Sequence, residues 1–113
     1  MAVAARSANR SDEVGCCSVR VSPIDDRLAL DLAQTFAALA DPVRLRLFSL
    51  IAAAGEACSC DLIDAVRKSQ PTISHHTKVL ADAGLITGRK EGRWVMWSVV
   101  PAQVERLRAA LAP

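Results

Sequence analysis

The sequence of 113 residues has no long apolar run and only four cysteines. No stretch approaches the ~20 consecutive apolar residues that a membrane-spanning helix needs. The first residues, MAVAARSANRSDEV, also lack the continuous apolar segment of a secretory signal. We therefore expect no membrane contact and a cytoplasmic location. In that reducing compartment, cysteines are poor candidates for structural disulfides and better ones for metal binding or redox chemistry.

Net charge is also small, but the charges are unevenly distributed. The formal net charge is only +2. Residues 1–66 carry six basic and nine acidic side chains, whereas residues 67–93 carry six basic and two acidic ones. One short segment thus holds the basic excess, as expected if a single element of the fold faces a phosphate backbone.

Chain length and composition favour one small, mostly helical domain. A chain of this length buries only a modest core, so burial by a second copy would stabilise it considerably. Hydrophobic residues make up 51% and charged residues 23%. Much of the apolar share is alanine and leucine, which favour helix over strand.

The sequence separates into two regions. Residues 1–21 are small, polar and irregular and predict a flexible N-terminal arm, whereas residues 22–113 predict the folded domain. In the domain, apolar residues recur at spacings of three and four, between capping side chains at helix starts and glycines at helix ends. The first helix has Ser22 as its expected cap and Pro23 in its first position. Asp41 and Ser69 are the expected caps of the helices that begin at 42 and 70, and Gly55 is the expected end of the helix from 42. The predicted helices run from 23 to about 38, from 42 to 54, through a short stretch ending near 67, from 70 to about 83, and from 101 to 111.

Two β-prone runs, 85–89 and 93–100, flank the turn residues Lys90, Glu91 and Gly92 and predict a β-hairpin. The predicted order is four helices, two strands and a fifth helix, a mainly α fold with a small β-hairpin. Two short helices joined by a tight turn and followed by a basic hairpin have the layout of a winged helix-turn-helix.

The helix that follows Ser69 has the features of a recognition helix. If Ile73, Thr77 and Leu80 face the core, hydrogen-bonding side chains lie on the opposite side and near the N-terminal half, the part that enters a major groove. Such side chains can contact base edges or phosphates, and basic residues on the hairpin would reach phosphates or the minor groove. The candidate DNA contacts are Gln70, Thr72, Ser74, His75, Lys78, Arg89, Lys90 and Arg93.

Two other interpretations of these residues are weaker. They could form only a solvated helix face and a soluble turn, or belong to a protein-interaction module that kept the fold without binding DNA. Because the basic excess of residues 67–93 coincides with the recognition helix and the hairpin, we favour DNA binding.

Three segments resemble the ArsR/SmtB family of metal-responsive repressors. They are SQPTISHHTKVLADAGLI at 69–86, DPVRLRLFSLI at 41–51 and EGRWVMWSV at 91–99. They follow the family's order, and the resemblance covers about residues 24–112. It implies a homodimer whose first and last helices form the interface. It also implies a repressor that leaves double-stranded operator DNA on binding its inducer.

His75 and His76 are the only histidines in the sequence. Adjacent residues on a helix point about 100° apart, so the two cannot easily bind one ion. We expect His75 to contact DNA and His76 to pack or to cap.

Cys58 and Cys60 lie two positions apart where a helix begins. An extended pair at that spacing can face the same way and chelate one ion. The nearby helix N-terminus favours thiolate, the form that binds metal. Cys16 and Cys17 add two soft ligands on the arm, so the four cysteines can build an all-sulfur site. A lone cysteine is often only a small buried hydrophobe, but two close pairs favour metal binding, with a disulfide-forming redox switch as the main alternative.

The segment CSCDL at 58–62 resembles the family's C-x-C-D-L ligand motif, which occurs in arsenite sensors and in cadmium and lead sensors. Ile63 stands where some arsenite sensors have a third cysteine, so the resemblance implies that Cys16 or Cys17 completes the site. The family's zinc site is missing from the last helix, where Glu105 is the only candidate ligand.

Ligand number distinguishes the possible inducers. Trivalent arsenic or antimony takes three thiolates in a pyramid and cadmium accepts four in a tetrahedron, whereas soft sulfur disfavours magnesium, calcium or manganese. Because adjacent cysteines can close a small chelate on a pyramidal centre, we favour As(III) or Sb(III), with Cd(II) or Pb(II) as the alternative.

An enzyme is the alternative of a different class. The cysteines form no C-x-x-C motif and no oxyanion-binding loop is present, which disfavours a thiol oxidoreductase or an arsenate reductase. We instead expect a dimer that represses by placing two recognition helices in successive major grooves of a palindromic operator. Binding of the ion would tie the arm to the helix at Cys58 and favour a conformation that no longer fits the operator.

Overall fold

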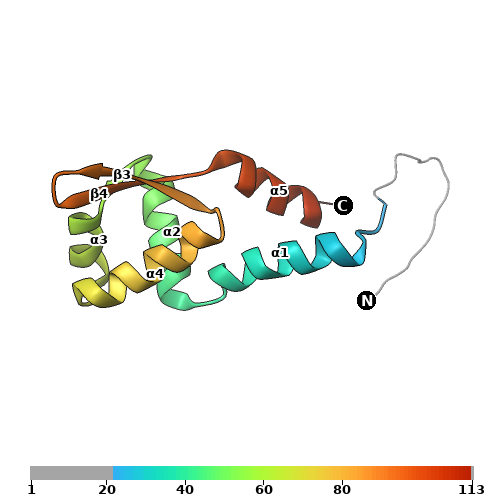
Figure 1. Cartoon of the computed structure of the whole chain (residues 1–113), viewed down its shortest axis with the longest axis horizontal. Coiled ribbons are helices and arrows are strands. Elements are labelled where there is room, and N and C mark those ends of the chain that lie inside the picture. Colours follow the sequence, from blue (N-terminus) through green and yellow to red (C-terminus); the bar gives the residue numbers. More distant parts are fainter. Residues whose placement is uncertain (1–21, 113) are drawn as a thin grey trace.

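The computed structural model describes residues 22–112, whose arrangement is shown in Figure 1. Helices and a small antiparallel sheet follow one another in the predicted mainly α arrangement, and the predicted hairpin is present. The elements are α1 (Asp26–Leu39), α2 (Pro42–Ala54), β2 (Ala57–Cys58), α3 (Ser59–Val66), α4 (Gln70–Asp82), β3 (Ile86–Glu91), β4 (Trp94–Val99) and α5 (Pro101–Leu111).

α1 begins later than the sequence predicts. Asp25, not Ser22, is its N-cap, and the Asp25 carboxylate accepts a hydrogen bond of 2.8 Å from the Leu28 N–H. Pro23 therefore precedes the helix instead of opening it. The charge of the Asp25 carboxylate also complements the helix dipole, which a serine hydroxyl does not.

α2 begins and ends where the sequence predicts. Asp41 accepts hydrogen bonds from the N–H groups of Val43 and Arg44 at 3.0 and 3.1 Å, and Pro42 opens the helix. Gly55 ends it with φ at 81°, a conformation that favours glycine. The local signals at both ends set the bounds of the helix, while its stability also depends on packing.

The sheet has the strand order β2-β4-β3. β3 and β4 form the predicted hairpin, which turns at Gly92 with φ at 61°. Lys90 and Glu91, predicted to lie in the turn, instead belong to β3 and pair with β4. β2 is not predicted by the sequence, although Ala57 pairs with Trp97 and Cys58 pairs with Met96. A strand of two residues has no alternating pattern to recognise, so its identity depends on the neighbouring strand.

One apolar core joins the helices to the sheet. α2 runs through its centre, and Leu47 and Ile51 on this helix are fully buried. Leu85 and Ile86 attach the start of the hairpin to the same core. The buried apolar residues are Leu32, Ala38, Leu47, Ile51, Ala57, Leu62, Val66, Ile73, Leu80, Leu85, Ile86 and Leu107.

α1 and α5 lie side by side and extend away from the helix-turn-helix and the hairpin (Figure 1). An ion pair of 2.7 Å between Asp31 and Arg106 joins them. Large apolar side chains remain exposed on this pair of helices, notably Leu30 at 63% and Leu111 at 72%. Even so, within residues 22–112 no helix has both the length and the hydropathy of a membrane span.

Candidate nucleic-acid interface and thiol site

α4 presents an apolar face inward and a polar face outward. Ile73, Thr77 and Leu80 are buried, as the candidate recognition helix requires. The side chains of Gln70, Ser74, His75 and Lys78 are exposed. This face is therefore free of core contacts along the N-terminal half of the helix, which is where a recognition helix meets base edges.

Thr72 is half-buried and takes part in the helix cap. The Ser69 hydroxyl donates to the Thr72 hydroxyl at 2.9 Å and accepts from the Thr72 N–H at 3.3 Å. Thr72 thus helps fix the start of α4, and a contact from its hydroxyl to DNA remains a prediction.

A groove of about 310 Å³ runs between α4 and β4. Gln70, Ser74 and Lys78 line it from the helix, and Arg93 lines it from the hairpin. The groove therefore gathers four candidate DNA contacts from two elements. The Lys78 ammonium also pairs with the Asp82 carboxylate at 3.0 Å, but both groups are largely exposed, so the pair holds the lysine only weakly.

The hairpin carries three basic candidates in different environments. Arg89 pairs with the Glu56 carboxylate at 3.0 Å and also with Glu91. The hydrogen bonds that Arg89 donates to these two carboxylates, to Glu56 first, raise the pKa of Arg89 above its usual value. Arg89 would therefore have to exchange a carboxylate for a phosphate on binding DNA. Lys90 is exposed, and the Arg93 guanidinium lies 5.3 Å from the ring centre of Trp94.

An unpredicted contact anchors α4 to the start of α2. The Arg44 guanidinium donates to Nδ1 of His76 over 3.3 Å and, through Nε, to the Ala38 carbonyl at 2.7 Å. His76 therefore packs, as expected, while His75 faces solvent. Asp41 belongs to the same cluster, and the hydrogen bond from the Arg44 N–H, together with the charge of Arg44, lowers the pKa of Asp41.

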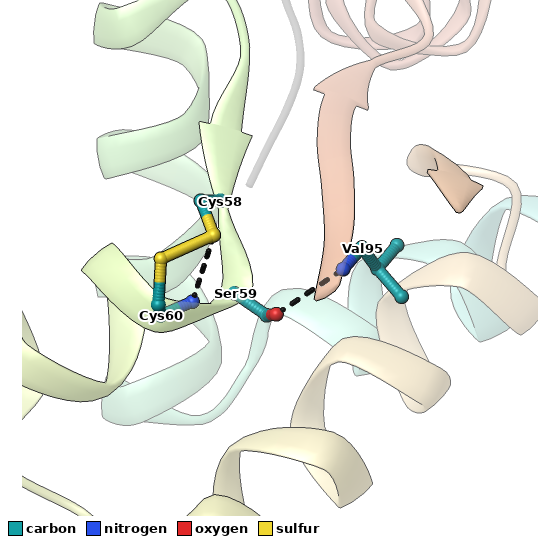
Figure 2. Close-up of a disulfide and its surroundings, with 4 residues drawn as sticks. All are labelled: Cys58, Ser59, Cys60 and Val95. Carbon is teal, nitrogen blue, oxygen red and sulfur yellow. Dashed lines mark hydrogen bonds between the residues drawn. A yellow bond between two sulfur atoms is a disulfide. The ribbon is translucent and has the colours of Figure 1, made fainter. Parts of the chain in front are cut away.

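Cys58 and Cys60 lie at the N-terminus of α3, as Figure 2 shows. Their sulfur atoms are joined as a disulfide. Cys58 is the N-cap, and its Sγ accepts a hydrogen bond of 3.2 Å from the Cys60 N–H. The sequence predicts thiols for metal binding here, with a disulfide-forming redox switch as the main alternative. The disulfide joins the last residue of β2 to the first turn of α3, and both sulfur atoms must be reduced before either can act as a thiolate ligand.

The described residues contain only two of the four predicted thiol ligands. Cys16 and Cys17 lie outside residues 22–112, as does the whole predicted arm. Within the described part of the chain, no three His, Cys, Asp or Glu side chains are grouped so as to hold a metal ion. A complete site with three ligands would therefore have to recruit a residue from outside this part.

The contacts made by Ser59, Glu56 and Arg44 are not predicted by the sequence. Ser59 lies between the cysteines, and its hydroxyl accepts a hydrogen bond of 3.3 Å from the Val95 N–H of β4 (Figure 2). Each of the three residues contacts a partner more than 30 positions away. No local pattern reports such contacts, because only the folded chain brings the partners together.

Known proteins are similar to this chain in sequence and in fold. The pattern described as a bacterial regulatory protein of the arsR family matches residues 41–87. An uncharacterized HTH-type transcriptional regulator of Methanocaldococcus jannaschii is 43% identical over 75 residues, which cover 66% of this chain and 84% of that protein. The chain belongs to the arsR family. It is thus a member of a family of regulators rather than of enzymes, and the predicted family resemblance is confirmed.

Relatives of this ArsR-family chain include proteins named for resistance to arsenic and cadmium. The arsenical resistance operon repressor of Escherichia coli is 44% identical over 68 residues, which cover 60% of this chain. A cadmium resistance regulatory protein, a CadC homolog of Staphylococcus aureus, is 35% identical over 78 residues, or 69% of this chain. The chain spans 58% and 64% of these two proteins' lengths.

Solved structures confirm that this chain has the winged helix-turn-helix fold. The homodimeric winged helix-turn-helix DNA-binding domain of a possible ArsR-family regulator from Mycobacterium bovis superposes with a TM-score of 0.63 at 28% identity, covering 80% of this chain and 84% of that one. The AntR antimony-specific transcriptional repressor superposes with a TM-score of 0.68 at 26% identity, covering 85% and 92%.

Proposed function

We propose that this ArsR-family chain is a cytoplasmic, homodimeric repressor that leaves its operator when As(III) or Sb(III) binds its cysteines. The observation that carries the proposal is the pair Cys58 and Cys60, whose sulfur atoms face each other at the entrance of α3, directly before the helix-turn-helix. Once reduced, this pair can hold one soft ion, and the helix N-terminus favours the thiolate form.

A third thiolate comes, in this proposal, from Cys16 or Cys17. Arsenite at neutral pH is As(OH)₃. Each thiol that binds it replaces one hydroxyl and releases one water, so three thiols give As(SR)₃ and three waters without any change in oxidation state. The names of the arsenical repressor and of the antimony-specific repressor support this choice of ion. The relative named for cadmium resistance supports the alternative, in which all four cysteines of this chain bind Cd(II) or Pb(II).

The DNA-binding side of the proposal rests on the exposed face of α4 and on the hairpin. Two copies of α4 would enter successive major grooves, and basic residues of the hairpin would contact phosphates. The exposed apolar surface of α1 and α5, with a hollow of about 520 Å³ between the two helices, supports their use as the dimer interface.

Release from DNA tests the inducer. Operator affinity is measured with arsenite, antimonite, cadmium, lead and zinc on the reduced wild type and on Cys16→Ser, Cys17→Ser, Cys58→Ser and Cys60→Ser. We expect arsenite and antimonite to weaken operator binding by about 5- to 150-fold, which is the usual range of such coupling. Cys58→Ser and Cys60→Ser should abolish the response. A response that survives the loss of all four thiols would rule out this mechanism.

Reciprocity provides a second check. Since coupling acts equally in both directions, operator DNA must weaken arsenite binding by the same factor. Equal arsenite affinities with and without operator would exclude an allosteric release.

Salt dependence tests the proposed DNA surface. Each lost phosphate contact lowers the slope of log affinity against log salt by about one, so Arg93→Gln should lower it by about two per dimer. Arg46→Gln is the matched control, because Arg46 is exposed on α2 and lies on neither the hairpin nor the helices of the proposed dimer interface. If the slope of log affinity against log salt is the same for the two variants, Arg93 does not contact a phosphate.

The disulfide between Cys58 and Cys60 favours one further candidate, a thiol redox sensor of the same fold. A peroxide would oxidise the pair, with two thiols and H₂O₂ giving a disulfide and two waters. In metal-free buffer, release of operator by peroxide and its reversal by dithiothreitol would support this candidate. A response to arsenite under reducing, oxygen-free conditions would support the metalloid sensor.

A further inference from the structure

One cysteine of the thiol pair, Cys58, lies in the sheet that contains the hairpin. Cys58 is the last residue of β2 and pairs with Met96 of β4, while it also caps α3. β4 is the central strand and carries the hairpin through its pairing with β3. Any rearrangement at Cys58 therefore acts directly on the hairpin, without passing through the core.

Ser59 continues this connection where β2 ends. Ala57 pairs with Trp97 and Cys58 with Met96, so the next pair in the same register is Ser59 with Val95. At Ser59 the backbone has already turned into α3, and its hydroxyl accepts the hydrogen bond of 3.3 Å from the Val95 N–H (Figure 2). The side chain thus supplies the acceptor that a further strand residue would have offered.

The same hydrogen bond borders the candidate DNA surface. Ser59 and Val95 both line the groove between α4 and β4, together with Ser74, Lys78 and Arg93. Arg93 is only two positions from Val95 on the hairpin. The position of Val95 therefore bears on where Arg93 lies relative to the recognition helix.

We propose that Ser59 is a positioning residue that couples the thiol pair to the hairpin. An ion bound by Cys58 and Cys60 takes the place of the disulfide and holds the two sulfur atoms further apart than a direct S–S bond does, so Ser59 between them must adjust. The Ser59 hydroxyl then moves relative to the Val95 N–H, and the hairpin shifts against α4. This coupling rests on the proposed release by a thiol-bound ion, and it assigns to Ser59 the step from ligand to DNA.

Two pairs of variants test the role of the hydroxyl. Ser59→Val and Ser59→Thr have nearly the same shape, but only the threonine keeps the acceptor. Ser59→Ala removes the hydroxyl with the smallest change, and Ser49→Ala, on the exposed face of α2, is its matched control. Circular dichroism establishes that each reduced, full-length variant is folded.

The measured quantity is the ratio of operator affinities without and with arsenite. A hydrogen bond of this kind corresponds to about a fivefold change in an equilibrium. We expect Ser59→Ala and Ser59→Val to lower the ratio about fivefold, and Ser59→Thr and Ser49→Ala to retain the wild-type ratio. Arsenite affinity in the absence of DNA should stay the same in all four variants.

Tryptophan emission gives a readout that needs no DNA. Trp94 and Trp97 are the only tryptophans of the sequence, and both lie on β4. Arsenite should shift the emission of the wild type and of Ser59→Thr, and should shift that of Ser59→Val much less.

The outcomes separate this coupling from the proposed function. A wild type whose operator affinity ignores arsenite overturns both. A wild type that responds, together with a Ser59→Val variant that responds equally, overturns the coupling alone. So does a Ser59→Val variant that only binds operator more weakly while keeping its ratio, because that is the result of a purely structural role. If Ser59→Ala does not fold, the comparison of valine with threonine still decides.

Discussion

Asp41 caps α2 by accepting hydrogen bonds from the N–H groups of Val43 and Arg44. The guanidinium of the same Arg44 donates to His76. The pKa of Asp41 lies below the ordinary value of 3.8, mainly because its carboxylate accepts the hydrogen bond from the Arg44 N–H. A lowered pKa in the folded state means that the ionised form stabilises the fold. This contribution is present above the unfolded-state pKa and is lost as the pH falls through the folded-state pKa.

We therefore expect Asp41→Asn to unfold more easily than the wild type at pH 7 and pH 5, by the same amount at both. The asparagine keeps a capping acceptor but has no charge. The difference should shrink at pH 3, which urea unfolding at the three pH values would measure. Asp41→Ala, which removes the cap as well, should be less stable than Asp41→Asn at every pH. A difference that grows on acidification would contradict this assignment of the charge.

At single residues, the sequence predicts the caps of α2 and α4 correctly, misplaces the cap of α1 and predicts no long-range partner. Asp41, Ser69 and Gly55 act within three or four positions of themselves, and all three have the predicted roles. Arg89 is correctly placed on the hairpin, but its pairing with Glu56 spans 33 positions. Such a pair forms only when two distant elements meet in space. The sequence therefore suggests that Arg89 is free to bind phosphate, whereas in the structure it is already paired with Glu56.

The hairpin depends on Gly88, whose place in β3 lies opposite Trp97. A Cβ at this position would lie 2.7 Å from Cγ1 of Val95 and 2.8 Å from a carbon of the Trp97 ring. Both distances are shorter than contacts between carbon atoms in proteins allow. Because glycine has no Cβ, it leaves room for the side chains of Val95 and Trp97 to lie against β3 at this position.

We expect Gly88→Ala to destabilise the protein by about 1–3 kcal/mol, the usual cost of overpacking, since Val95 and Trp97 must move. Chemical denaturation would measure the loss, and tryptophan emission would report the altered surroundings of Trp97. Thr87→Ala, at the exposed neighbouring position, is the control. If the stability and the emission of Gly88→Ala equal those of the wild type, β3 and β4 accommodate the added methyl group without a loss of free energy, which would contradict this prediction.

Among the elements, α2, α3, α4, the hairpin and α5 have the predicted order and nearly the predicted bounds. β2 escapes prediction because it has two residues and its partner lies about 40 positions further along. The predicted start of α1 is wrong by three residues, because Ser22 followed by proline has the pattern of a helix start but Asp25 is the residue that caps the helix.

For the molecule as a whole, the exposed apolar side chains of α1 and α5 are the feature that a single copy leaves unexplained. Leu30 and Leu111 are 63% and 72% exposed. A second copy that covered this surface would remove these side chains from water, and each fully buried leucine contributes about 1.5–3 kcal/mol. The proposed homodimer gives the two helices that role.

We expect Leu30→Glu and Leu111→Glu to sediment as monomers at concentrations at which the wild type is dimeric. Their operator affinity should fall roughly 100-fold or more, because the two half-sites are no longer bound by one molecule. Leu45→Glu is the matched control, since Leu45 is 53% exposed but lies on α2. Sedimentation velocity decides, and dimeric Leu30→Glu and Leu111→Glu variants would place the interface elsewhere.

The sequence by itself determined the helix order, the hairpin, the inner and outer faces of the recognition helix and the family, because caps, periodicity and short motifs act over a few positions. Tertiary structure decided what those residues contact. Only folding adds β2 to the sheet, sets Ser59 against Val95, pairs Arg89 with Glu56 and joins Arg44 to His76. Each of these contacts requires segments that lie far apart in the chain to meet, and a local pattern contains no information about such meetings.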